Sequence, residues 1–159
     1  MVGFLRNLFG KPSTVEQLAQ SGDREAFFRK LGDSDIFVIA ATEGDGLDPS
    51  NMTEEQFLAE IERAAKELNE RQEGFAPFVY DRNGRRRLPF FTSNTYAQVF
   101  AGEYAKERNR VYPFQLLGVQ GALLVQLLPA CDELVMNDRT KMEFTLSDAD
   151  VAVMKEMWR

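Results

Sequence analysis

The sequence predicts an α+β domain in which helices flank a mixed β-sheet that contains an antiparallel hairpin. Three patterns lead to this prediction. Asn83-Gly84 lies between two apolar-rich segments and is typical of a type I′ hairpin turn, because both residues tolerate positive φ. The continuous apolar run 36–41 is typical of a central strand that is buried on both faces. Apolar residues at helical spacing between 57 and 68 indicate an amphipathic helix.

The chain of 159 residues is expected to form one globular unit, because this length is typical of a single domain with a full core. Residues 1–32 are expected to form a helical segment that packs on the domain, and residues 33–159 to form the α+β domain itself. A composition of 44% hydrophobic and 28% charged residues is ordinary for a globular protein, so disorder is not expected.

Two short helices are expected before the first strand. Ser13 and Glu16 have the spacing of a capping box, in which the hydroxyl and the carboxylate each accept a free backbone amide. Asp23 is expected to cap the second helix, and Gly32 lies where a left-handed residue often ends a helix.

The amphipathic helix in the middle of the chain is expected to begin after Thr53, with Gln56 in the reciprocal capping position. Its apolar stripe consists of Phe57, Leu58, Ile61, Ala64, Ala65 and Leu68. The hairpin 75–91 follows, in a register that places Asp81 opposite Arg86. Prolines at 77 and 89 indicate that at least one hairpin strand lies at an edge of the sheet.

The rest of the chain continues the alternation of helices and strands. The expected elements are a helix from Thr92-Ser93, a strand at 111–117, a short helix at 119–128, two strands at 134–136 and 142–146 around a turn at 137–139, and a final helix capped by Ser147.

Four short segments carry a resemblance to a known family. They are Leu88-Pro89-Phe90-Phe91-Thr92-Ser93, the stretch from Leu116-Leu117-Gly118 to Leu127, the turn Leu134-Val135-Met136-Asn137, and the ending Phe144-Thr145-Leu146-Ser147. In order and spacing they resemble the N-terminal domain of the SseB family, named for enhanced serine sensitivity in bacteria. The resemblance implies a bacterial α+β domain and no established reaction, so it carries over no catalytic residue. One departure is Asn137-Asp138-Arg139, where the family often has Asn-Pro-Gly, and it leaves the conformation of this turn open.

Composition excludes several kinds of chemistry. The chain has no histidine, which removes histidine-based catalytic triads, general bases and metal ligands together. Its one cysteine, Cys131, lies in an apolar stretch and is interpreted as a small buried thiol. Ser93 is interpreted as a helix cap rather than a nucleophile. We expect no cofactor, no stoichiometric transition metal and no enzymatic activity.

The expected compartment is the cytoplasm. No apolar run approaches the roughly 20 residues that span a bilayer. The start of the chain, residues 1–11, has too short an apolar part for a signal peptide. It is interpreted as an amphipathic end that packs on the domain or on a partner, and a membrane-surface anchor is the alternative.

Two local features are candidate binding sites. The loop 43–48 concentrates carboxylates and glycines but lacks the spacing of an EF-hand or a phosphate loop, so a solvated turn is preferred to a metal site. The other feature is a cluster of four arginines at the hairpin tip: Arg82, Arg85, Arg86 and Arg87. Exposed charge can protect a sheet edge, but arginine is also suited to bidentate recognition of carboxylate or phosphate. We expect Arg86 to be the least available of the four, because the register places it opposite Asp81.

These observations favour a non-enzymatic bacterial protein-interaction module, such as an adaptor or a toxin-neutralising immunity-type protein, whose partner has an acidic surface. The alternative is a binding or enzymatic domain for a small anionic ligand, using the arginine hairpin or the acidic loop with a metal. A formal charge of −6 argues against nucleic acid as the partner. The sequence indicates neither an oligomeric state nor a physiological role.

Overall fold

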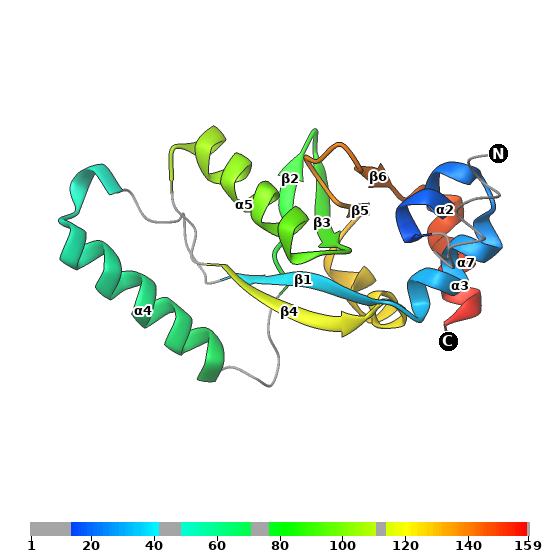
Figure 1. Ribbon diagram of the computed structural model, residues 1–159, viewed down its shortest axis with the longest axis horizontal. Helices are drawn as coiled ribbons and strands as arrows, with labels where there is room; N and C mark the ends of the chain where they lie inside the picture. Colours follow the sequence, from blue (N-terminus) through cyan, green and yellow to red (C-terminus); the bar gives the residue numbers. More distant parts are fainter. Residues whose placement is uncertain (1–13, 42–48, 71–76, 111–113, 159) are drawn as a thin grey trace, which may run out of the picture.

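The computed structural model describes residues 14–41, 49–70, 77–110 and 114–158, and its elements are labelled in Figure 1. The helices are α2 (Val15–Ser21), α3 (Arg24–Gly32), α4 (Glu54–Glu70), α5 (Asn94–Arg108), α6 (Leu124–Leu127) and α7 (Asp148–Met157). The strands are β1 (Asp35–Ala41), β2 (Tyr80–Arg82), β3 (Arg85–Phe91), β4 (Phe114–Gln120), β5 (Glu133–Met136) and β6 (Phe144–Thr145). Three short 3₁₀ turns are η1 (Pro49–Asn51), η2 (Gly121–Leu123) and η3 (Leu128–Ala130).

The strands form one mixed sheet in the order β4-β1-β3-β5-β6, with β2 paired to β3 beside this path. The β3–β5 pairing is parallel and every other pairing among these strands is antiparallel. The prediction of an α+β fold with a mixed sheet and an antiparallel hairpin is therefore confirmed.

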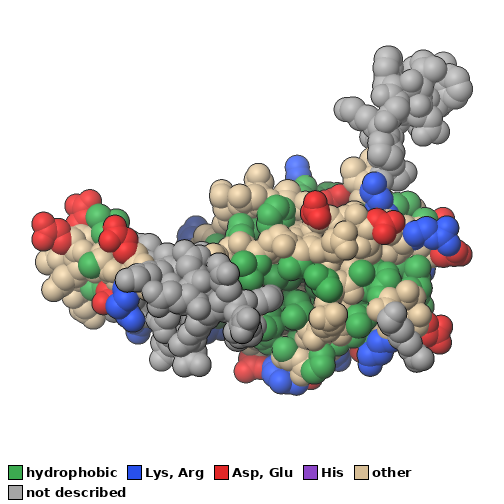
Figure 2. Space-filling view, turned by 90° about the horizontal axis from the view of Figure 1, so that it is seen from below, with side chains coloured by type: hydrophobic (Ala, Val, Ile, Leu, Met, Phe, Trp, Pro, Cys, Tyr) green, Lys and Arg blue, Asp and Glu red, His purple; other side chains and the backbone are tan. Residues whose placement is uncertain are grey.

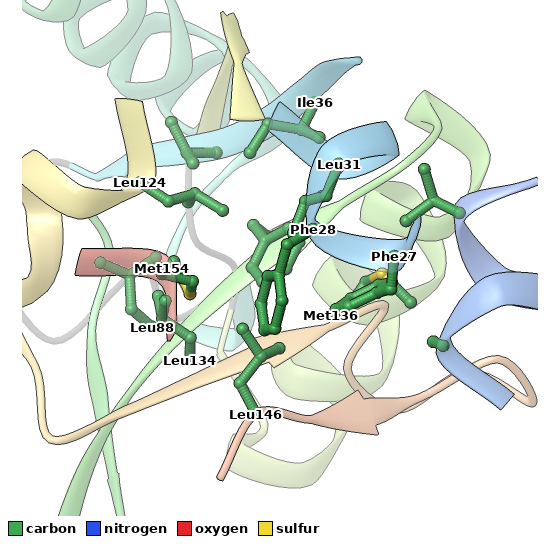
Figure 3. Close-up of a cluster of buried hydrophobic side chains, with 14 residues drawn as sticks. Phe27, Phe28, Leu31, Ile36, Leu88, Leu124, Leu134, Met136, Leu146 and Met154 are labelled. Carbon is green, nitrogen blue, oxygen red and sulfur yellow. The ribbon is translucent and has the colours of Figure 1, made fainter. Parts of the chain in front are cut away.

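Two hydrophobic clusters cover the two faces of the sheet, because side chains alternate between the faces along each strand. On one face Phe27 and Phe28 of α3 pack on Leu88 and Leu134, and Figure 3 shows this cluster together with Met154 of α7. On the other face α5 packs its buried residues against β1 and the hairpin. The residues of this second cluster are Ile39, Phe78, Tyr80, Phe91, Ala97, Phe100 and Tyr104.

The hairpin has the predicted turn and register. Asn83 and Gly84 have φ values of 54° and 81°, and Asp81 pairs with Arg86. Pro89, however, lies in a central strand, since β3 has neighbours on both sides. It lies where the partner of β3 changes from β2 to β1, and there Phe78 donates to the Ile39 carbonyl at 2.7 Å. A residue without an N–H is therefore tolerated at this position.

Two details expected before the first strand differ in the structure. Ser13 lies outside the described residues, and the first helix is capped by Thr14 in a capping box with Gln17. Gly32 is not left-handed. It lets Trp158 pack closely, because a Cβ at Gly32 would lie 2.7 Å from the indole nitrogen.

The short helix expected at 119–128 begins late. β4 continues to Gln120, and η2, α6 and η3 follow it. The strand forms because all seven residues of β4 pair with β1, and this pairing outweighs the helical spacing of the leucines. No helix in the described part of the chain is both long and apolar enough to cross a membrane.

Candidate functional site

The hairpin tip brings the four arginines together but leaves them in different environments. Arg82 and Arg85 pair across the turn. The Arg85 guanidinium lies 3.2 Å from Glu133 and 3.7 Å from Asp148, and it donates to the Asp132 carbonyl at 3.0 Å. Its side chain is still 49% exposed, so its cation remains accessible to a partner.

Arg86 and Arg87 do not have the availability that the sequence suggested. Asp81 is the cross-strand neighbour of Arg86, but the Arg86 guanidinium forms its ion pair with Asp132 at 3.4 Å and stays half-exposed. Arg87 is buried, with its Nε 2.9 Å from Glu133 and its Nη2 3.4 Å from the Thr145 hydroxyl. Arg87 is therefore the least available of the four, because the parallel β3–β5 pairing places it directly beside Glu133.

Arg82 is the arginine whose charge is least compensated. Within the described residues it has no ion-pair partner, and its charge is one of the causes that hold the pKa of Glu143 below its ordinary value. Arg82, Arg85 and Arg86 are therefore exposed to solvent at the tip, while Arg87 is buried.

A groove of about 680 Å³ lies between the hairpin tip, the start of β5 and α7. Its lining includes Arg85, Lys155, Asp148 and the apolar side chains of Leu128 and Val151. A shallower apolar depression formed by Val125, Leu128, Pro129 and Lys155 adjoins it, since the two share Leu128 and Lys155. The lining of the groove thus combines apolar side chains and two cations with three carboxylates, those of Asp132, Glu133 and Asp148.

A second, more polar pocket of about 350 Å³ lies between β2 and α5. Its lining consists of Tyr80, Asp81, Arg82, Glu103, Glu107, Arg108 and Arg139. Arg139 stacks its guanidinium over the Tyr80 ring at 5.3 Å and forms an ion pair with Glu107. Its buried Nε has no hydrogen-bond partner among the described residues.

The sequence predicted the turn between β5 and β6 but not the contacts that its side chains make. Asn137 and Arg139 both have positive φ, at 52° and 62°. The buried Asn137 side chain accepts from the Thr92 N–H at 3.0 Å and donates to the Thr92 hydroxyl at 3.1 Å. The turn therefore holds the start of α5, where Ser93 acts as the helix cap that its position predicted. The signal in the sequence was Asn137 itself, since asparagine tolerates left-handed φ.

Asp138, the central residue of this turn, is fully buried and titrates far from its usual range. Tyr80 donates a hydrogen bond to Oδ2, and no donor in the described part of the chain reaches Oδ1. Burial, together with the neighbouring Glu143 carboxylate, raises the pKa of Asp138 from 3.8 to about 6, against the opposing effects of Tyr80 and Arg87.

Glu143 is the acidic partner in this pair. Burial tends to raise its pKa, but the Arg139 N–H at 2.9 Å and the bond with Asp138 hold the pKa of Glu143 below its ordinary value. The pKa of Asp138 is thus raised and that of Glu143 lowered, so Asp138 keeps its proton to higher pH than Glu143 does.

Two further candidates from the sequence are a metal site in the loop 43–48 and a nucleophile at Cys131. The loop 43–48 lies outside the described residues. Within the rest of the chain, no group of three or more histidine, cysteine or acidic side chains is arranged to hold a metal ion. Cys131 is half-buried, and burial raises the pKa of its thiol. The thiol is thus a weak nucleophile at neutral pH.

Residues 14–153 match the family model of the SseB protein N-terminal domain. The chain belongs to the SseB family. The match includes α2 and α3, which precede β1, as well as the hairpin and the β5–β6 turn. No curated protein and no solved structure matches the chain.

Proposed function

We propose that this SseB-family chain is a non-catalytic interaction module that binds an acidic segment of another protein in the groove beside the hairpin tip. The observation that supports this most is the combination of an apolar floor, at Leu128 and Val151, with two exposed cations, Arg85 and Lys155. Such a groove can bury an apolar side chain while a neighbouring carboxylate pairs with a cation.

A carboxylate of the partner would compete with Asp148 of this chain for the Arg85 guanidinium. Arg85 is held by Glu133 at 3.2 Å and only loosely by the exposed Asp148 at 3.7 Å. Lys155 has no ion-pair partner within the described residues. A bound carboxylate can therefore replace the Asp148 contact without breaking the ion pair with Glu133.

The test uses the double variant Arg85→Glu/Lys155→Glu. The native partner is first captured from host extract and identified, and its binding kinetics are then measured at two salt concentrations. Exposed charges act mainly on encounter, so the variant should associate more slowly and lose the salt dependence of the association rate.

The matched control reverses two exposed cations elsewhere, in the variant Lys30→Glu/Arg63→Glu. Thermal melting of both variants verifies that each is folded. Association that is as fast in a folded groove variant as in the control would show that the partner binds another surface.

The polar pocket supports a second candidate function, the binding of a small anion. Arg82, Arg108 and Arg139 converge on it, and one buried guanidinium nitrogen of Arg139 is unpaired. Guanidinium groups suit carboxylate and phosphate ligands. A thermal-shift screen with inorganic phosphate, citrate and pyrophosphate tests this function. Stabilisation that disappears in Arg82→Ala/Arg108→Ala would favour it, whereas no shift with any anion would exclude it for these probes.

A further inference from the structure

In the described part of the chain β4 forms one edge of the sheet, and α4 is a helix that approaches it. β4 pairs with β1 on one side and ends the strand order on the other. Its seven residues, Phe-Gln-Leu-Leu-Gly-Val-Gln, include neither a charge nor a proline. Natural edge strands usually carry such residues, because a free ladder of N–H and C=O groups pairs with other chains.

The other edge strands in the described part of the chain are less open to pairing, because they are short or carry charged residues. β6 has two residues, and β2 has three, of which Asp81 and Arg82 are charged. β4 is longer than either of them. It is therefore the described strand that is best suited to pair with another chain.

Part of β4 is exposed among the described residues. Gly118 and Gln120 are exposed, and Leu116, Leu117 and Val119 are half-buried. A Cβ at Gly118 would meet only the Phe37 ring, at 3.9 Å, so the backbone there is open. Figure 2, which views the molecule from below Figure 1, shows hydrophobic side chains gathered on this side of the molecule.

The hydrogen-bond pattern determines which β4 residues face outward. Just beyond the strand, the Gly121 N–H donates to the Ser34 carbonyl at 2.9 Å in the register of the β1–β4 pair. Inward and outward bonding alternate along an antiparallel strand. The N–H and C=O groups of the even-numbered residues, Phe114, Leu116, Gly118 and Gln120, are therefore directed away from β1. On β1 the same alternation holds, since the Ile39 carbonyl bonds on the other side, to Phe78.

We propose that β4 pairs antiparallel with β4 of a second copy of this chain, forming one continuous sheet across a two-fold axis at Leu117. In this register all seven residues pair. Leu116 lies opposite Gly118 and Phe114 opposite Gln120, and these are the residues whose backbone groups are directed away from β1. Gly118 leaves room for the facing leucine side chain, because a Cβ at this position would have almost no neighbour.

A second copy fits this edge better than an unrelated strand for two reasons. A contact across a two-fold axis is self-complementary. When all seven residues pair, the residues whose N–H and C=O groups are directed away from β1 lie opposite one another. The chain has a formal charge of −6, but β4 has no charge, so the two copies meet without like charges opposite each other.

The size of the contact predicts a reversible dimer. A strand of seven residues is about 24 Å long at about 3.4 Å per residue, and two such strands bury less area than a standard interface of about 1,600 Å². We therefore expect a weak, reversible dimer rather than an obligate one. This contact is separate from the hairpin groove, so it stands or fails independently of the proposed partner binding.

Sedimentation velocity from about 5 to 500 µM tests the dimer, over a range of concentrations suited to weak, reversible association. The wild type should shift from monomer to dimer. Gly118→Lys should remain monomeric at every concentration, because it introduces a charged side chain on the edge. Gly102→Lys is the matched control, since Gly102 is exposed on α5 with nothing within 4 Å of its Cβ position. A wild type that stays monomeric at 500 µM, or a dimer that Gly118→Lys leaves intact, overturns the proposal.

Cysteine cross-linking tests the register, in a Cys131→Ser background. In a non-hydrogen-bonded pair the two Cα atoms are about 4.5 Å apart, within reach of a disulfide. Leu117→Cys should therefore form a covalent dimer on mild oxidation. Gln115→Cys should not, because its neighbour across the axis is Val119. Cross-linking that is equal at both positions, or stronger at 115, overturns the proposed register.

Discussion

Substitution of Asp138 by asparagine should stabilise the protein at neutral pH, even though Asp138 is a fully buried polar residue. An asparagine side chain reproduces the protonated acid, because its oxygen can accept from the Tyr80 hydroxyl and its NH₂ can donate to the Glu143 carboxylate. Unlike the acid, it never has to carry a charge in this buried turn.

The sign and size of the effect follow from linkage. The folded state raises the pKa of Asp138 from 3.8 to about 6, so between these values it binds more protons than the unfolded chain. The free energy of unfolding therefore falls as pH rises through this window, by up to about 3 kcal/mol at about 1.36 kcal/mol per unit. The pKa of Glu143 is lowered in the folded state, so this residue stabilises the wild type as pH rises and offsets part of the effect. We therefore expect the free energy of unfolding of Asp138→Asn to exceed that of the wild type by about 1–3 kcal/mol at pH 7.5.

The assay is urea unfolding of wild type and Asp138→Asn at pH 4, 5, 6, 7 and 7.5. The two proteins should have similar stability at pH 4 and diverge as pH rises, until the difference reaches a plateau above pH 7. Asp81→Asn, an exposed residue of the hairpin, is the control for the same chemical change and should show no divergence in this window. A stability difference that is constant across pH, or an Asp138→Asn protein that is less stable than wild type at pH 7.5, would refute the linkage argument.

Two further predictions concern close packing and the buried arginine. Gly121→Ala should destabilise the protein by about 3 kcal/mol or more in urea unfolding, because its Cβ would lie 1.8 Å from the Leu31 carbonyl oxygen, whereas Gly118→Ala should cost far less. Arg87→Ala should lower the free energy of unfolding by about 1–3 kcal/mol, since it removes the buried cation beside Glu133 and leaves Glu133 only its ion pair with the more exposed Arg85. Arg86→Ala, which removes a half-exposed cation, should change it by only about 0.5 kcal/mol, and equal losses for the two variants would contradict the burial of Arg87.

Local sequence determined the features that depend on a few neighbouring residues. Asn83-Gly84 specified the hairpin turn and its register, because few other residues adopt two successive left-handed conformations. Ser147 and Asp150 form a reciprocal capping box at the start of α7, where the sequence placed a helix cap. The apolar run 36–41 became a central strand because a strand between two neighbours, with a hydrophobic cluster on each face of the sheet, buries apolar side chains on both of its faces.

Only the tertiary structure decided how the four arginines differ. The hairpin register alone suggested that Asp81 would engage Arg86, but β5 approaches β3 on its other side and supplies Asp132 and Glu133. No local pattern reveals that parallel pairing, because its partners are more than forty residues apart in the sequence. The same holds for Asp138, whose pKa depends on Tyr80 and Glu143 meeting it in one buried turn. The sequence shows which charged groups are present, but the long-range contacts of the fold determine which of them form ion pairs within the chain and which remain available to a partner.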